Sequence, residues 1–166
     1  MTRVVTVMAT VIALMCAVVA AGIWLLVRHR PPQLPEISAY SNGLLTRTGP
    51  FTYCPVLDLT NCDNPNAVGE LRVTDHYPVQ LSVPSEVSRG LWVLLRLYDN
   101  ADDNGEDKMR PGTLAATVPT VGPHGGRLDR IEVQLVTVAR TPTGELAYVA
   151  HAVWSMAMVW PQPKGE

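Results

Sequence analysis

An uninterrupted apolar run near the N-terminus most constrains what this 166-residue chain can fold into. Residues 4–27 carry no charged side chain, and Arg28, His29 and Arg30 close the run. At about 1.5 Å per residue, a helix of this length would extend about 36 Å, and the hydrocarbon core of a bilayer is about 30 Å thick. The run therefore predicts a single transmembrane helix, with the rest of the chain beside a membrane.

Two other interpretations of this run compete with a permanent anchor. A cleaved signal peptide has a shorter apolar core, of about 7–15 residues, followed by small residues. Here residues 23–27 continue the run beyond the small cluster at 20–22. A lipoprotein carries a small residue directly before its lipidated cysteine, whereas Met15 precedes Cys16. We therefore expect a retained anchor that contacts lipid through residues 4–27, and leave lipidation of Cys16 open.

Charges beside the anchor do not settle its orientation. Arg28 and Arg30 on the C-terminal side outnumber Arg3, which by itself favours a cytoplasmic domain. However, domains longer than about 60 residues are translocated largely regardless of flanking charge. Cys54 and Cys62, the only cysteines after the anchor, suit a disulfide, which persists in oxidising compartments. We therefore expect a single-pass protein of the cell (inner) membrane with its domain on the extracytoplasmic side.

The remaining sequence predicts one domain close to the membrane. We expect an anchor over 1–30, a Pro-rich tether over 31–36, the domain over 37–160 and a tail over 161–166. Prolines favour an extended form of about 3.1 Å per residue, so the tether is short. Ten Lys and Arg remain in the domain against 15 Asp and Glu. This acidic balance argues against nucleic acid as a partner.

Short apolar runs separated by Gly, Pro and Asn predict an all-β domain. The Asn42-Gly43 pair predicts a type I′ turn between two strands, and Asp99–Asp107 reads as a polar loop. The expected strands cover residues 37–41, 44–48, 70–74, 77–83, 91–98, 113–118, 131–139 and 145–160, with a turn at 141–144. This number and spacing predict an immunoglobulin-like β-sandwich. The Cys…Trp…Cys spacing of true immunoglobulin domains is absent, so the likeness concerns architecture only.

The last predicted strand is apolar on both faces. Alternation puts seven residues on a single face: Tyr148, Ala150, Ala152, Trp154, Met156, Met158 and Trp160. Such a strand is either central or covered by something else. We therefore name a candidate contact set for a partner or ligand, although most of its members also suit a core. This set consists of Trp92, Trp154, Met156, Met158 and Trp160.

Cys54 and Cys62 form the strongest local signal. A disulfide between them would close a nine-residue loop and stabilise the fold by about 2.6 kcal/mol in the chain-entropy model. A structural zinc site is the alternative, but it needs four ligands. Only His76 lies close enough in sequence to suggest a third. The disulfide is the favoured prediction, and we predict no metal and no cofactor.

Other polar segments resemble functional motifs only in part. With Gly105 as the sixth residue of a calcium loop, Pro111 occupies the twelfth position, where a glutamate belongs, so a solvated connection is favoured over a calcium site. The segment 122–126 resembles a glycine-rich oxyanion loop, but no Gly-x-Ser-x-Gly accompanies it. We expect a flexible turn in this segment. We also expect that the protein is not an enzyme. The least implausible catalytic groups are Asp58, His76 and His151.

Several segments together resemble an actinobacterial family of short exported proteins, catalogued only as a domain of unknown function. The segments are Tyr53–Cys54, Cys62–Gly69, Val79–Val87, Leu91–Trp92 and Ala152–Ser155. The resemblance implies an envelope location in a mycolate-type actinobacterium and genes that neighbour a transporter of the major facilitator type. Many members look like lipoproteins, from which Met15-Cys16 departs. The family supplies no catalytic residues.

Together these observations predict a non-enzymatic accessory protein of the cell envelope. Its expected partner is an integral membrane protein, a transporter or an envelope-assembly factor, contacted through the anchor and the sandwich. Two tethered contacts reinforce each other even when each is weak. The alternative is an extracytoplasmic module that binds a lipid or glycan in an apolar pocket between the sheets, lined by Trp92 and Trp154.

Overall fold

The computed structural model describes residues 2–28, 34–140 and 144–161. The chain divides into two units, Met1–Gln33 and Leu34–Glu166, and each is described by itself. Most of the predicted tether and tail, and most of the turn predicted at 141–144, lie outside the described residues.

The first unit is one helix, α1 (Thr2–Arg28). Its segment Thr6–Arg28 has a mean hydropathy of 2.6 and is long and apolar enough to cross a membrane. Membrane anchors and signal sequences share these properties. Cys16 is exposed on this helix. The predicted N-terminal apolar helix is therefore confirmed.

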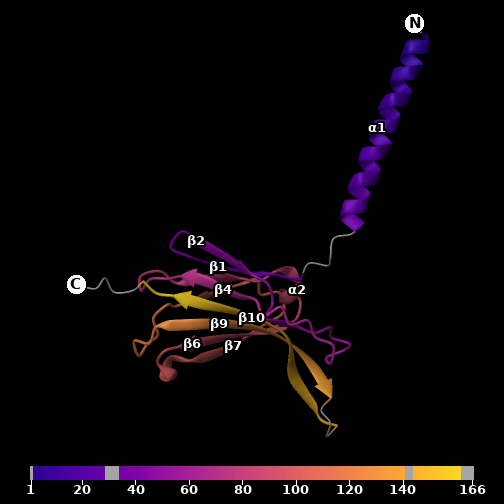
Figure 1. The fold of residues 1–166 in the computed structure, drawn as a ribbon. Helices are drawn as coiled ribbons and strands as arrows, with labels where there is room; N and C mark the ends of the chain where they lie inside the picture. The colour runs from indigo at the N-terminus through magenta and orange to yellow at the C-terminus, as the bar shows by residue number, and fades with distance from the viewer. Residues whose placement is uncertain (1, 29–33, 141–143, 162–166) are drawn as a thin grey trace. The chain divides into compact units, whose positions relative to one another are not determined.

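The second unit is a mostly β domain built from two sheets (Figure 1). The smaller sheet has the order β2-β1-β5-β8 and comprises β1 (Ile37–Ser41), β2 (Leu44–Thr48), β5 (Val79–Ser82) and β8 (Ala115–Val118). The larger has the order β3-β10-β9-β6-β7, with β4 paired in parallel beside β10. Its strands are β3 (Thr52–Tyr53), β4 (Val68–Arg72), β6 (Leu91–Tyr98), β7 (Gly105–Met109), β9 (Leu128–Arg140) and β10 (Leu146–Val159). Two short helices, α2 (Ser85–Ser88) and η1 (Ala101–Asp103), complete the domain.

One apolar core joins the two sheets, which confirms the all-β sandwich. The smaller sheet contributes residues such as Ile37 and Leu81, and the larger contributes Trp92, Ile131 and Trp154. All five are fully buried. The first hairpin also forms as predicted: Asn42 and Gly43 have φ values of 46° and 78°, which a type I′ turn requires. Immunoglobulin-like connectivity stays a prediction.

Strand β10 differs from its predicted alternation because it contains a β-bulge. Ala150 pairs with Val136 but Ala152 pairs with Leu135, so His151 is an extra residue in the ladder. One extra residue reverses which face each later side chain occupies. Ala152, Trp154, Met156 and Met158 therefore face the core, whereas Tyr148 and Ala150 are exposed. The prediction that all seven side chains share one face was wrong at this point.

The segment Asp99–Asp107 is also more ordered than the predicted polar loop, since η1 and the start of β7 lie within it. The side chain of Asp103 is fully buried. It accepts hydrogen bonds from the backbone N–H groups of His124 (2.9 Å) and Gly126 (2.7 Å), and pairs with the His124 ring. A Cβ at Gly122 or Gly126 would overlap the Asp103 side chain. The segment 122–126 therefore serves as a cap over this carboxylate.

The carboxylates of this segment are used within the fold rather than gathered around a cation. Asp99 accepts the N–H of Arg127 at 2.6 Å, and Asn104 accepts the N–H of Tyr98 at 2.7 Å. Within the part of the chain that the structure describes, no group of three or more His, Cys, Asp or Glu side chains is placed to hold a metal ion. These hydrogen bonds stabilise carboxylates that lie close together in the sequence.

Replacing Trp154 with Phe tests the contribution of its buried indole. Trp154 donates a hydrogen bond from Nε1 to the Pro35 carbonyl at 2.8 Å, so the variant leaves that carbonyl without its donor and opens a small cavity. We expect the free energy of unfolding to fall by about 2–4 kcal/mol. Urea unfolding of the full chain in mild detergent, followed by circular dichroism, measures it.

Trp160→Phe is the matched control, because Trp160 also donates to a carbonyl, that of Leu128 at 2.8 Å, but is only half-buried. Water can replace that hydrogen bond, so we expect a loss below about 1 kcal/mol. Equal losses in the two variants would contradict the assigned difference in burial.

Asp103 predicts a specific pH dependence of stability. Burial alone would raise the pKa of this carboxyl, but the hydrogen bonds from His124 and Gly126 outweigh burial and hold the pKa below its ordinary value. The resulting stabilisation is complete above the unfolded-state pKa of about 4 and is lost as the pH falls through the lowered folded-state pKa. Asp103→Asn should lower the urea midpoint at pH 7, and its difference from the unmodified chain should shrink as the pH falls below about 4. A difference that stays constant over this range would show that the carboxylate charge is not involved.

Candidate functional site

The outer face of the larger sheet, opposite the core, carries a shallow groove of about 470 Å³. Its floor is formed by alternate residues of β6, Leu91, Val93 and Leu95, and by Val136 of the neighbouring β9. Their partners in alternation, Trp92 and Leu94, face the core. Strand β6 is therefore apolar on both faces. It lies between β9 and β7 in the sheet, and its outer face lines the groove.

Polar side chains flank the central β6 part of this floor on both sides. Glu106 and Lys108 project from β7, the edge strand, and Gln134 projects from β9. Lys108 Nζ lies 3.9 Å from Glu106 Oε1, so the two charges offset each other. The groove thus combines an apolar floor with a polar rim of little net charge. Its volume lies within the range of about 300–1,000 Å³ typical of small-molecule sites.

The opposite side of the groove is formed by Tyr148 and Ala150 of β10, the residues that the bulge places on the outer face. Here β9 and β10 continue beyond the end of β6 as a two-stranded arm, visible in Figure 1 as the curved orange and gold extension. Val138 pairs with Tyr148 across this arm, and both are more than half exposed. The apolar surface of the groove therefore continues along the arm.

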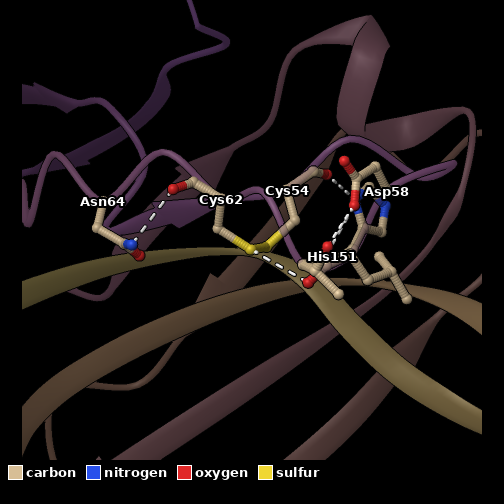
Figure 2. Close-up of a disulfide and its surroundings, with 7 residues drawn as sticks. Cys54, Asp58, Cys62, Asn64 and His151 are labelled. Atoms are coloured by element: carbon tan, nitrogen blue, oxygen red, sulfur yellow. Dashed lines mark hydrogen bonds between the residues drawn. A yellow bond between two sulfur atoms is a disulfide. The ribbon is translucent and has the colours of Figure 1, made fainter.

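A second surface, the cysteine loop (residues 54–62), adjoins the bulge. Cys54 and Cys62 form the predicted disulfide (Figure 2). The Cys54 N–H donates to the His151 carbonyl at 2.7 Å. Nδ1 of His151 lies 3.1 Å from the Cys54 carbonyl oxygen. His151 is buried, as expected for an interior histidine. The loop is thus attached to β10 at both the backbone and the His151 side chain.

The tip of the cysteine loop is apolar and fully exposed. Leu57 has an exposed fraction of 101% and Val56 of 53%. Next to them, Asp58 accepts hydrogen bonds from the Thr60 hydroxyl at 2.7 Å and the Thr60 N–H at 3.2 Å. Both hydrogen bonds hold the pKa of Asp58 below its ordinary value, and the bond from the Thr60 hydroxyl has the larger effect. The loop therefore presents two aliphatic side chains beside an ionised carboxylate.

The predicted contact set lies mainly in the core. Trp92, Trp154 and Met156 are fully buried, and Met158 is 6% exposed. The indole N–H of Trp92 donates to the Thr113 carbonyl at 3.1 Å. Trp160 alone of the set is half-buried, with the Arg127 guanidinium over its ring at 5.1 Å. Four of these five side chains are therefore not available to a docking partner, and Trp92 and Trp154 do not line the groove.

The candidate catalytic groups each have a partner within the fold. Asp58 is held by Thr60, His76 pairs with its exposed neighbour Asp75, and His151 faces the Cys54 carbonyl. His124, from the segment that resembled an oxyanion loop, pairs with Asp103 at 2.9 Å. The expectation that the chain is not an enzyme stays a prediction.

The groove residues were missed because the pattern in β6 has two meanings. A run that is apolar on both faces signals either a strand buried between two layers or a strand with one functional face. The arm was missed because the bulge at His151 is not visible in the alternation of residues 145–160. The one available signal was Tyr148 within an apolar strand, an amphipathic residue suited to a half-exposed surface.

Residues 30–159 match a family model described as a protein of unknown function, DUF2771. Similar curated proteins are uncharacterized protein Rv0875c of Mycobacterium tuberculosis and uncharacterized protein Mb0899c of Mycobacterium bovis. Each is 50% identical to this chain over 150 residues, which cover 90% of this chain and 93% of the relative. No solved structure matches. These matches confirm the resemblance to an actinobacterial family, and the chain belongs to the DUF2771 family of proteins of unknown function.

Proposed function

We propose that this protein is a membrane-anchored, extracytoplasmic binding module that holds the acyl chain of an envelope lipid in the outer-face groove. The observation that carries this proposal is the apolar floor of a groove of about 470 Å³, in which Leu91 and Leu95 are partly exposed and Val93 lies buried between them. Contiguous exposed apolar surface is costly in water and marks sites of interaction. The proposed role is non-enzymatic.

The shape and charge of the groove support an acyl chain over a glycan. A glycan needs many directed hydrogen bonds, whereas the floor offers aliphatic side chains alone. The charged pair Glu106 and Lys108 lies on one side only, on the edge strand β7, which suits a ligand with one polar end. Because Lys108 is offset by Glu106, the rim favours no strongly charged head group.

The helix and the disulfide support the proposed location. Residues 4–27 would remain in the cell (inner) membrane as an anchor, and the Cys54–Cys62 disulfide is expected in an oxidising compartment. A domain held close to a bilayer meets lipid at high effective concentration. The groove can then work with modest intrinsic affinity.

Filling the groove tests this proposal. Gln134→Trp places an indole over the floor from the middle of β9, so we expect the Kd for a fluorescent fatty acid such as cis-parinaric acid to rise by at least about tenfold, or about 1.4 kcal/mol. Fluorescence titration of the purified full chain in mild detergent measures it. Mass spectrometry of lipid retained from native membranes should show a parallel loss.

Gln80→Trp is the matched control, because Gln80 is exposed on β5 of the smaller sheet, away from the groove. It should bind the probe as the unmodified chain does. Equal binding by Gln134→Trp, or no saturable binding by the unmodified chain, would overturn the acyl-chain proposal.

The exposed tip of the cysteine loop favours a second function, docking on an integral membrane protein such as a transporter or an envelope-assembly factor. The disulfide and the bonds to His151 restrain the backbone of the loop that presents Val56 and Leu57 to solvent, so binding costs less backbone entropy than it would in a free loop. The ionised Asp58 beside them disfavours an anionic lipid surface. An apolar pocket on a protein partner fits this tip better.

Leu57→Ser tests the docking function. If Leu57 fills a partner's pocket as a hot spot, its loss costs at least about 2 kcal/mol and weakens binding by about 30-fold. We expect recovery of the partner with the tagged full chain from native membranes to fall accordingly, as measured by quantitative mass spectrometry. Leu45→Ser, at an exposed leucine of β2, is the control and should leave recovery unchanged. The same set of membrane proteins at the same yield from both variants would argue against this role for the loop.

A further inference from the structure

The two-stranded arm leaves one backbone edge of β10 open. Residues Leu146–Ala150 pair with β9 on one side, and among the described strands none pairs with them on the other. The open edge ends at His151, whose carbonyl accepts the Cys54 N–H, and β3 begins to pair at Ala152. It is therefore five residues long, with Tyr148 at its centre.

This edge lacks the features that normally protect a strand from pairing. Edge strands are usually blunted by charged residues, by proline or by bulges within them. Strand β7, the opposite edge of the same sheet, carries Glu106, Asp107 and Lys108. Residues Leu146–Ala150, in contrast, have no charged or proline residue, and Leu146 and Tyr148 are 69% and 72% exposed. A two-stranded ribbon of this kind is only marginally stable by itself.

We infer that this edge pairs antiparallel with the same edge of a second copy of the chain, so that the two larger sheets become continuous. Pairing centred on Tyr148 places Leu146 opposite Ala150 of the other copy, and Ala147 opposite Val149. Each large aliphatic side chain then meets a small one, and no like charges face each other. The five-residue segment is thus complementary to itself in size and charge.

The symmetry of this pairing preserves the faces of the sheet. A two-fold axis perpendicular to the sheet keeps Leu146, Tyr148 and Ala150 of both copies on the outer face. The two grooves would then open on the same side, next to each other. Attachment to one membrane raises the effective concentration of the second copy, so a short interface suffices. The inference does not depend on the ligand of the groove.

Disulfide trapping in the full chain tests the inference. In a Cys16→Ser background, Tyr148→Cys places two cysteines across the two-fold axis, within the 4.4–6.8 Å between Cα atoms that a disulfide spans. Under mild copper-phenanthroline oxidation in detergent, we expect more than about half of the chain to form a dimer that reductant dissolves. Non-reducing electrophoresis measures it, and native mass spectrometry of the Cys16→Ser parent should give the mass of two chains.

Val138→Cys is the control, because Val138 is exposed on the same face of the arm, directly beside Tyr148 but on β9. With strands about 4.8 Å apart, two copies of residue 138 would lie about 14 Å apart, beyond the reach of a disulfide. We expect at least about fivefold less dimer than for Tyr148→Cys. Equal trapping of the two variants, a parent with the mass of one chain, or a different protein bound to this edge would each overturn the inference.

Discussion

The extra residue at His151 is the constraint on which both faces of the larger sheet depend. Side chains after the bulge, such as Trp154 and Met156, enter the core, and those before it, such as Tyr148, reach the outer face. Because side chains alternate with a period of two, one inserted residue is enough to reverse this assignment. The same residue attaches the cysteine loop through its carbonyl group and its ring. The core, the groove and the loop are thus arranged around one irregularity in β10.

Strand β6 of the larger sheet carries apolar side chains on both faces, whereas the outer face of its neighbour β9 has Val136 beside the polar Gln134 and Glu132. The core face is covered by the smaller sheet, and that burial supplies most of the stability of the domain. No described strand or helix packs over the part of the outer face that forms the groove, although neighbouring side chains shield most of Val93 from solvent. Because the groove is already present in the folded domain, an apolar ligand could enter it with little rearrangement of the protein.

The acidic and glycine-rich segments illustrate how polar residues can serve the fold. Asp103 is buried and accepts hydrogen bonds from backbone groups of segment 122–126, where Gly122 and Gly126 allow the chain to come close. A buried carboxylate that is fully hydrogen-bonded is tolerated, and an unpaired one is not. The tryptophan N–H groups follow the same rule, since those of Trp92, Trp154 and Trp160 all donate to backbone carbonyls.

The sequence by itself determined the features that depend on local chemistry. The length of an apolar run, the Asn42-Gly43 turn, the pairing of Cys54 with Cys62 and the two-sheet β class all follow from short-range rules. The sequence also identified Trp92 and Trp154 as candidate core residues. The tertiary structure alone decided which face of β6 is covered, where β10 changes face and which edge remains unpaired. These depend on contacts between residues far apart in the chain, such as Val136 with Ala150 and Cys54 with His151, and no local pattern encodes them.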